Sequence, residues 1–321
     1  MIKLIQLDPN GLCNAGCWFC PVSYTPNPEF AKKTMDIETV RSIIKQVKEG
    51  IGDFVDPSFG FVYTAHYNEV LLYRHFKEML DILREYKLGT MVLTNGIPLT
   101  KDKTDLIKEY LDVVHAIHFN VPSSEPETWS KMVGLNVKIH DKVMSNIRYA
   151  IDSLPHPMLS LQVNGVRNAS LSSSGGMMTL LENAPDLNLD DESGDTATAL
   201  KNMKALFPEM KIFENSSLVD RAGYLDKHGV MTNINAINRL VKKDNTKIIG
   251  CNNMNSRTEN WLHVNANGDV FICCNDYDFE TVFGNVHNTS IRDIWYSSDR
   301  KEMINKSYNG LCTTCVHAIW A

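Results

Sequence analysis

The amino-acid sequence predicts an α/β fold, a partial (β/α)6 barrel followed by a small C-terminal domain built from a β-hairpin and a helix. Six short apolar segments alternate with stretches of helical period over residues 2–213. Such alternation implies parallel strands joined by right-handed helical crossovers. The eight cysteines lie outside residues 21–250, three before this range and five after it. This separation indicates two metal centres.

The strands and helices of the barrel follow from the apolar pattern. The first helix starts at Asp36, whose side chain can cap it, and its apolar residues from Val40 to Val47 fall at i, i+3, i+4 and i+7. Similar stripes occur around residues 76–83, 106–111, 143–151 and 197–206. The expected strands are Ile2–Leu7, Phe59–Thr64, Met91–Leu93, Val113–Phe119, Met158–Val163 and Lys211–Phe213. In such TIM-like barrels the reacting groups lie at the C-terminal ends of the strands.

The C-terminal part begins with a predicted hairpin. Trp261–Val264 and Asp269–Ile272 flank the turn Asn265–Gly268, which places a glycine where a positive φ is needed. We therefore expect a barrel over residues 1–225, a helical linker over 226–250 and an auxiliary domain over 251–321.

Composition narrows the class of protein. The chain has 321 residues, of which 43% are hydrophobic, and a formal net charge of −6. A negative net charge argues against general nucleic-acid binding, because phosphate contacts need a cationic face. The sequence has no signal peptide and no apolar run of the roughly 18 residues that a membrane span needs. We expect a cytoplasmic protein, in which cysteines serve as metal ligands more often than as disulfides.

The N-terminal thiols belong to the segment Leu12–Pro21, which contains Cys13, Cys17 and Cys20. Their spacing is too short for strands or helices to lie between them. One loop must therefore carry the three thiols, and they are expected to surround a common metal centre. Three ligands leave a metal position open, whereas structural zinc sites are normally closed by four. A zinc knuckle or three unrelated buried thiols are the alternatives.

These three cysteines, with the aromatic Phe19 before the third, resemble the signature loop of the radical S-adenosylmethionine (radical SAM) superfamily. The resemblance implies a [4Fe-4S] cluster whose open iron is chelated by the amino and carboxylate groups of S-adenosylmethionine. It also implies reductive cleavage to a 5′-deoxyadenosyl radical, which abstracts a hydrogen atom from a substrate. A one-electron donor such as flavodoxin or ferredoxin is then needed, and Phe19 becomes a candidate cofactor contact.

Further cofactor contacts are carried over from the same resemblance. The segment containing Asn68 and Glu69 stands where the family has Gly-Gly-Glu-Pro, which lines the amino group of S-adenosylmethionine; only Glu69 matches. A solvated surface carboxylate is the alternative. Asn120, after the fourth strand, can donate a hydrogen bond to a carboxylate. Asn164, after the fifth strand, suits a ribose hydroxyl or simply forms a turn. No catalytic residue emerges, although His66 is a possible general base.

Three other features complete the predicted barrel mouth. Glu127–Gly134 resembles a helix motif in which an arginine precedes the glycine, but Val133 stands there. Arg221 faces substrate or S-adenosylmethionine, or pairs with Asp220. The long connection over residues 168–195 is a substrate-covering loop or a disordered segment.

The C-terminal thiols resemble the shortened SPASM or "twitch" extension of radical SAM enzymes. Four residues separate Gly268 from Cys273, as in that pattern, and Cys312 and Cys315 form its Cys-x2-Cys pair. The resemblance implies one auxiliary [4Fe-4S] cluster held by Cys251, Cys273, Cys312 and Cys315, which leaves Cys274 unassigned. Zinc is the alternative. A fully ligated cluster would transfer electrons or shape the pocket.

Relatives with this extension modify ribosomally made peptides, or oxidise and rearrange small molecules such as aminocyclitols and nucleotides. The first barrel strand begins at residue 2, so we expect no N-terminal peptide-recognition domain. This favours a polar small-molecule substrate. A peptide substrate remains an alternative, as does a non-catalytic iron–sulfur or zinc protein with a degenerate S-adenosylmethionine site.

Overall fold

The computed structural model describes residues 1–24, 33–64, 67–163, 178–180, 196–214, 220–233, 247–253 and 256–321. The chain forms two compact units. The first consists of Met1–Cys13, Thr25–Thr90 and Ala236–Ala321, and the second of Asn14–Tyr24 and Met91–Asn235. The division of the chain at residues 225 and 250 stays a prediction.

The first unit contains a sheet centred on β1 (Leu4–Leu7). Strand β1 pairs in parallel with β2 (Phe61–Tyr63) on one side and with β10 (Trp261–Val264) on the other. The start of β3 (Gly89–Thr94) pairs in parallel with β2. Beyond β10 the sheet continues with antiparallel β11 (Asp269–Phe271) and β12 (Val282–Asn285). The predicted hairpin is thus confirmed, and it extends the sheet that β1 starts.

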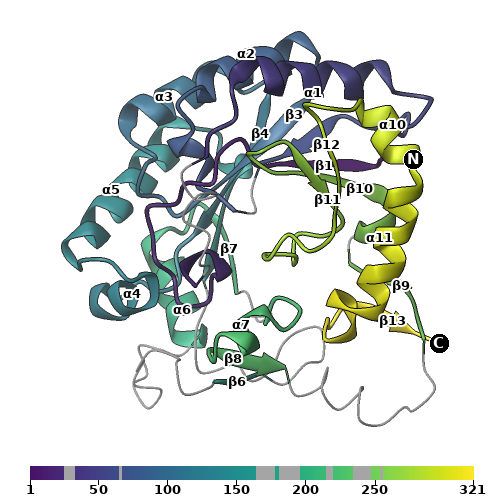
Figure 1. Ribbon diagram of the computed structural model, residues 1–321. Helices are drawn as coiled ribbons and strands as arrows, with labels where there is room; N and C mark the ends of the chain where they lie inside the picture. The colour runs from purple at the N-terminus through teal and green to yellow at the C-terminus, as the bar shows by residue number, and fades with distance from the viewer. Residues whose placement is uncertain are drawn as a thin grey trace. The chain divides into compact units, whose positions relative to one another are not determined.

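Helices α1 (Ile37–Glu49) and α2 (Phe76–Glu85) pack against each other in the first unit (Figure 1). The side chain of Asp36 accepts the backbone N–H of Thr39 at 2.9 Å, which confirms the predicted cap. The apolar stripe expected for α1 is completely buried, and it consists of Val40, Ile43, Ile44 and Val47. Apolar periodicity alone therefore located both helices.

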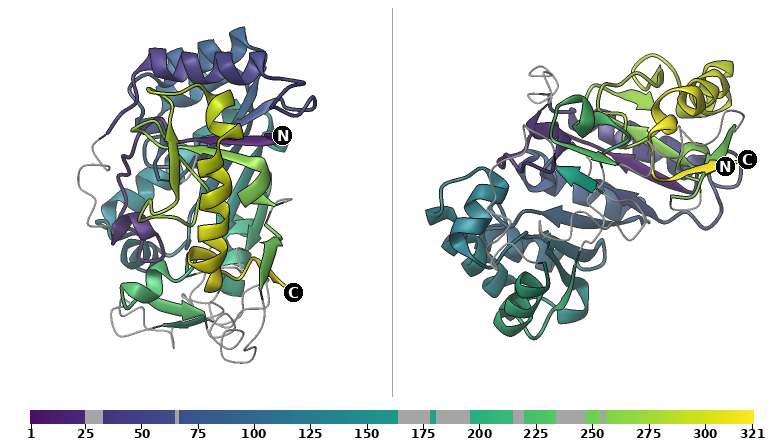
Figure 2. Two further views of the ribbon diagram at one scale, coloured as in Figure 1. Left: turned by 45° about the vertical axis from the view of Figure 1, so that its right-hand side comes forward. Right: turned by 90° about the horizontal axis from the view of Figure 1, so that it is seen from below.

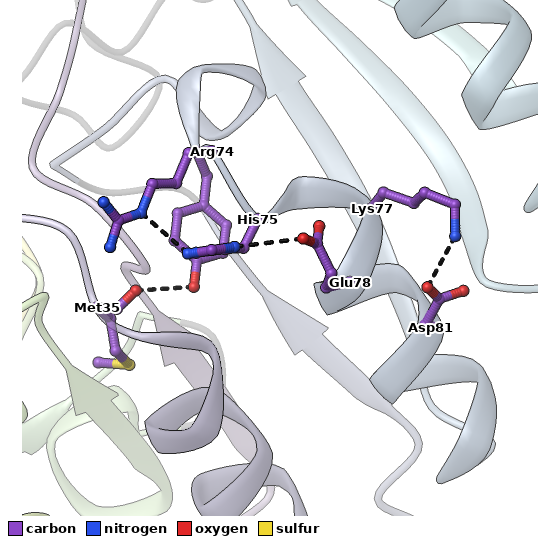
Figure 3. Close-up of polar contacts among 7 residues, drawn as sticks. Met35, Arg74, His75, Lys77, Glu78 and Asp81 are labelled. Carbon is purple, nitrogen blue, oxygen red and sulfur yellow. Dashed lines mark hydrogen bonds and ion pairs between the residues drawn. The ribbon is translucent and has the colours of Figure 1, made fainter.

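The start of α2 is anchored by short polar contacts (Figure 3). The hydroxyl of Tyr73 donates to the carbonyl oxygen of Met35 at 2.9 Å. The ring of His75 lies between Arg74 Nε, at 2.9 Å, and a carboxylate oxygen of Glu78, at 3.3 Å. The Tyr73 bond holds the preceding 3-10 turn η3 (Val70–Leu72) beside the start of α1.

Two short strands and a long helix end the chain. Strand β9 (Ile248–Cys251) pairs antiparallel with β13 (Ala318–Trp320), so that Ala318 lies opposite Cys251. Helix α11 (Ser298–Asn309) lies beside β9 (Figures 1 and 2). The remaining elements of this part are α9 (Arg257–Asn260), α10 (Ile291–Tyr296) and η6 (Leu311–Thr313).

The second unit contains the parallel strands β4 (Val114–Asn120), β5 (Leu159–Val163) and β7 (Lys211–Glu214), in the order β3-β4-β5-β7. Side chains alternate along these strands: Ile117 and Leu161 are buried, while His118 and Gln162 are half-buried. The helices of this unit are α3 (Lys101–Glu109), α4 (Pro126–Val133), α5 (Lys138–Ser153), α6 (Thr196–Leu206) and α7 (Tyr224–Lys227). Two further strands, β6 (Met178–Leu180) and β8 (Met231–Asn233), form an antiparallel pair. Two short 3-10 turns, η1 (Pro21–Ser23) and η4 (His156–Met158), complete the unit.

The observed fold is the predicted α/β partial barrel with a C-terminal hairpin and helix. Boundaries moved by a few residues: β1 starts at Leu4, because Ile2 forms only an isolated bridge with Val55. Most of the predicted loop over 168–195, and residues 234–246 of the linker, lie outside the described residues. No helix in the described ranges is long and apolar enough to cross a membrane.

Candidate functional site

The N-terminal cysteine loop rests on the C-terminal end of α4. The backbone N–H of Gly16 donates to the carbonyl of Val133 at 2.8 Å, and that of Trp18 to the carbonyl of Met132 at 3.2 Å. These carbonyls belong to the last turn of a helix, where intrahelical partners are missing. Gly134 follows with a φ of +66°, and a Cβ there would lie 2.8 Å from the carbonyl oxygen of Gly16. The backbone approach therefore requires glycine.

A second contact fixes the same loop. Asn95 Nδ2 donates to Asn14 Oδ1 at 2.8 Å, while Asn95 Oδ1 accepts the N–H of Ile97 at 3.0 Å. Asn146 in α5 donates to the carbonyl of Gly96 at 2.9 Å and secures this turn. The sequence showed Asn95 only as part of a Thr-Asn-Gly turn. Its place after a barrel strand was the available signal for a role at the site.

The three thiols differ in their surroundings. Cys13 is exposed, while Cys17 and Cys20 are half-buried. Burial raises the pKa of the Cys20 thiol, and the Val22 N–H and the Arg221 guanidinium partly oppose this shift. Arg221 thus acts electrostatically on the cysteine loop. Phe19 is buried and meets the Trp18 ring edge-on, with the centroids 5.9 Å apart; its cofactor contact stays a prediction.

Asn68 and Glu69 occupy a buried segment of the first unit. Glu69 is only 2% exposed, which excludes the surface-carboxylate alternative. Its backbone N–H donates to the carbonyl of Leu12 at 2.7 Å, directly before Cys13. Both polar atoms of the Asn68 carboxamide are buried and have no hydrogen-bond partner within the described part of the chain. Buried amides are normally satisfied, so this one suits a polar ligand.

Aromatic packing holds this segment in place. The hydroxyl of Tyr67 donates to the carbonyl of Tyr277 at 2.8 Å. The Tyr67 ring stacks on Phe279 with centroids 5.3 Å apart and planes at 28°. Tyr277 and Phe279 belong to the loop after Cys274, so the C-terminal part positions the segment that carries Asn68.

A polar group lies on one face of the second unit's sheet. The His118 ring nitrogens approach Ser160 Oγ at 3.0 Å and Gln162 Oε1 at 3.3 Å, and the ring stacks on Phe213 at 5.0 Å. Burial lowers the pKa of His118, and the hydrogen bond that the Gln162 amide oxygen accepts from the ring partly offsets this. Asn120 ends β4 in register with Gln162. Asn164 and His66 lie outside the described residues.

The four C-terminal thiols predicted as ligands all belong to the first unit, and all are buried. Burial raises the pKa of Cys312, with further contributions from Cys315 and Cys251. The thiol of Cys273 interacts with Cys315 in the same way. The four thiols come from β9, the end of the hairpin and the η6 region.

Backbone N–H groups point at three of these sulfurs. Asn253 donates to Cys251 Sγ at 3.4 Å, Asn275 to Cys273 Sγ at 3.5 Å and His317 to Cys315 Sγ at 3.5 Å. Hydrogen bonds to ligand sulfurs are a feature of iron–sulfur sites. Among the described residues no three donor groups are arranged around a single metal ion. A cubane does not need such a group, because its four thiolates bind four different irons. Four buried thiols, three of which accept backbone N–H groups, have the donor chemistry that a [4Fe-4S] cluster uses, and the ligand set stays a prediction.

Two sequence families match the chain. The radical SAM superfamily matches residues 9–168, and the iron–sulfur cluster-binding SPASM domain matches residues 251–316. The first match contains Cys13, Cys17 and Cys20, and the second contains the four C-terminal thiols. No curated protein sequence matches.

Solved structures share the fold across nearly the whole chain. BtrN in complex with AdoMet and 2-DOIA is 18% identical, with a TM-score of 0.55, over 99% of this chain and 93% of BtrN. Streptococcus suis SuiB bound to precursor peptide SuiA is 13% identical, with a TM-score of 0.59, over 98% and 71%. AnSMEcpe with bound AdoMet is 12% identical, with a TM-score of 0.58, over 99% and 86%.

The two family matches account for both cysteine groups. Radical SAM domains carry a [4Fe-4S] cluster and S-adenosylmethionine, and a SPASM domain adds iron–sulfur binding of its own. The predicted cofactors are thereby confirmed at the level of the family. The chain belongs to the radical SAM superfamily and carries a C-terminal SPASM-type iron–sulfur domain.

Proposed function

We propose that this protein is a radical SAM enzyme that cleaves S-adenosylmethionine reductively and removes a hydrogen atom from a polar small molecule. The outcome is an oxidation, an epimerisation or a rearrangement. The observation that carries the proposal is the backbone bond of 2.7 Å from Glu69 to Leu12, which joins the predicted amino-group site to the start of the three-thiol loop.

Each predicted residue has a role in this proposal. Cys13, Cys17 and Cys20 hold the cluster that, with S-adenosylmethionine bound, supplies the 5′-deoxyadenosyl radical. The buried carboxylate of Glu69 is placed to pair with the ammonium group of the cofactor, since opposite charges stabilise each other where water is excluded. The Asn68 carboxamide supplies a donor and an acceptor beside it.

The remaining cofactor contacts are assigned by position. Asn120 ends β4, where it can donate to the methionine carboxylate, and Asn164 follows β5, where it suits the ribose. Phe19 is buried within the thiol loop, with its ring against that of Trp18. The chain's own contribution is to orient the target C–H bond and to exclude competing groups from the radical.

The polar group of His118, Ser160 and Gln162 supports a polar small-molecule substrate. These side chains share one face of neighbouring parallel strands and offer hydrogen-bond donors and acceptors together. BtrN, which has the same fold, was solved with 2-DOIA. A peptide substrate is the second candidate, because SuiB was solved with its precursor peptide. A short precursor-peptide gene beside this one would favour the peptide.

Anaerobic reconstitution tests the reaction. After addition of iron, sulfide, dithionite and S-adenosylmethionine, we expect 5′-deoxyadenosine to form, and flavodoxin or ferredoxin to replace dithionite as the one-electron donor. Cys17→Ala is expected to abolish the product, whereas Cys274→Ala, outside both predicted ligand sets, is expected to retain it. Iron bound without any 5′-deoxyadenosine would instead indicate a non-catalytic iron–sulfur protein.

A further inference from the structure

A half-buried arginine, Arg257, lies beside the C-terminal thiols. Arg257 opens helix α9, and its Nη1 donates a hydrogen bond to Cys274 Sγ. The guanidinium carbon stands 4.2 Å from the centroid of the Trp261 ring, which covers one face of the group. The backbone N–H of Arg257 donates to the carbonyl of Asn253 at 3.0 Å. The arginine is thus fixed to the turn that follows Cys251.

Thiol groups contribute to the electrostatic surroundings of Arg257. Its charge interacts with the thiol groups of Cys274, Cys273 and Cys251. A guanidinium stays protonated in proteins, so a permanent positive charge stands here, partly shielded from solvent. Buried charges are normally paired with carboxylates or coordinated to metals. Arg292, by comparison, is exposed and pairs with Asp53 at 2.6 Å.

Cys273 and Cys274 are adjacent and buried, but their sulfurs accept hydrogen bonds from different partners. Cys273 accepts the N–H of Asn275 and interacts with Cys315, as a member of the four-thiol set does. Cys274 accepts the guanidinium of Arg257. The sulfur of Cys274 is therefore engaged by the guanidinium of Arg257. If Cys274 were a cluster ligand, its sulfur would have to bind iron and accept this hydrogen bond at the same time.

We propose that Arg257, held in place by Cys274 and Trp261, raises the reduction potential of the auxiliary cluster. The inference rests on the proposed ligand set of Cys251, Cys273, Cys312 and Cys315. Reduction adds one electron to the cluster and breaks no bond, so the unit of cluster and thiolates becomes more negative by one charge. A fixed cation close by stabilises the reduced form, and its partial burial strengthens the interaction.

The experiment uses Cys13/Cys17/Cys20→Ala protein reconstituted anaerobically, so that the auxiliary cluster is observed alone. A redox titration followed by electron paramagnetic resonance gives the midpoint potential of this parent protein. At that potential, Arg257→Gln is expected to lower the ratio of reduced to oxidised cluster about tenfold. This fall corresponds to a midpoint potential lower by about 59 mV for one electron. Arg257→Met, also neutral, is expected to give the same fall.

Two matched variants separate charge from structure. Arg257→Lys retains the positive charge. At the midpoint potential of the parent, its ratio of reduced to oxidised cluster is expected to stay within a factor of about three of the parent's ratio. Arg292→Gln removes an exposed guanidinium from the same unit and is expected to change nothing. Cys274→Ala is expected to keep about four irons, whereas Cys273→Ala is expected to lose them.

An unchanged midpoint in Arg257→Gln and Arg257→Met, with four irons bound, would overturn the inference. Loss of iron from Cys274→Ala with retention in Cys273→Ala would make Cys274 the ligand and overturn it as well. A parent protein that binds no iron would refute the auxiliary cluster itself, which is a different failure because no paramagnetic signal would then exist to titrate.

Discussion

Gly134 is the residue at which the cysteine loop depends most directly on a missing side chain. Alanine there would adopt a left-handed φ and place its Cβ 2.8 Å from the carbonyl oxygen of Gly16. We expect Gly134→Ala to lower the free energy of unfolding by about 2–4 kcal/mol, from conformational strain and the displaced loop together. Urea denaturation of the apoprotein measures the loss, and anaerobic reconstitution is expected to recover less iron at the loop.

Gly52 provides the matched control for this prediction. It has a φ of +90°, but a Cβ at that position would meet no atom within 4 Å. Gly52→Ala should therefore show the conformational cost alone, about 1–2 kcal/mol, and bind iron normally. Equal losses in the two variants would mean that the contact with Gly16 contributes nothing.

His118 gives a pH dependence whose sign follows from burial. Because burial lowers its pKa in the folded protein, the unfolded chain takes up a proton first as the pH falls below about 6.5. The unfolded state then binds more protons, so His118 reduces stability on acidification and has no effect above that range. We expect His118→Gln to flatten the fall in unfolding free energy between pH 7.5 and 5.5, measured by urea denaturation.

The exposed His115 on the same strand is the comparison for that measurement. His115→Gln is expected to leave the pH dependence of the parent unchanged. If both variants retain the parent's slope, the ring of His118 is free to protonate in the folded state and the assigned sign is wrong.

At the scale of elements, helix α1 depends on its N-terminal cap. Asp36 accepts the N–H of Thr39 at 2.9 Å and its hydroxyl at 2.6 Å, and these bonds lower the pKa of the Asp36 carboxyl. Asp36→Ala is expected to cost about 1 kcal/mol at pH 7, whereas Asp36→Asn should retain most of the cap. As the pH falls through the lowered pKa, the difference between parent and Asp36→Ala should shrink to the difference between Asp36→Asn and Asp36→Ala, and thermal unfolding at several pH values checks this.

The elements that could be predicted from sequence are those with a strong local period. The stripe from Val40 to Val47 and the hairpin turn at Gly268 each carry their own signal, and both formed as expected. The β6–β8 pair has no such signal, because each strand has three residues and gains its partner across a long stretch of chain.

The candidate site also contains features with a local sequence signal and features without one. Cysteine spacing indicated both thiol groups, because cysteines on one loop or in a Cys-x2-Cys pair are close in sequence. The contact of Asn95 with Asn14, and that of Arg257 with Cys274, join residues 81 and 17 positions apart. Such contacts depend on tertiary packing, and no local pattern indicates them.

At the scale of the whole molecule, the C-terminal part completes the sheet of the first unit. Strand β10 pairs with β1 from Leu4 to Leu7, and the Tyr277 carbonyl accepts the hydroxyl of Tyr67. A chain truncated after residue 250 exposes one edge of β1. It is expected to be insoluble or to lack a cooperative unfolding transition, as circular dichroism would show. A soluble truncated protein that unfolds cooperatively would contradict the dependence on β10.

Tyr67→Phe, which removes one hydroxyl, should fold, and its free energy of unfolding should fall by about 1 kcal/mol.

The two thiol groups are expected to load independently. Cys13/Cys17/Cys20→Ala protein should retain about four irons after anaerobic reconstitution, and protein with the four C-terminal ligands replaced by alanine should likewise retain about four. Iron and sulfide analysis of both variants measures this. Stoichiometric zinc in place of iron in the first variant would contradict an iron–sulfur cluster at the C-terminal site.

The docking of the thiol loop on α4 has a consequence for electron affinity. The amides of Gly16 and Trp18 are engaged by the carbonyls of Val133 and Met132. They are therefore unavailable to the inorganic or cysteinyl sulfur of a cubane bound in the loop. Each amide withheld from sulfur leaves more negative charge uncompensated and makes the couple a stronger reductant. The proposed function breaks a sulfonium C–S bond by one-electron transfer and demands such a reductant, so on that proposal we expect the helix end that seats the loop to help keep the loop's cluster strongly reducing.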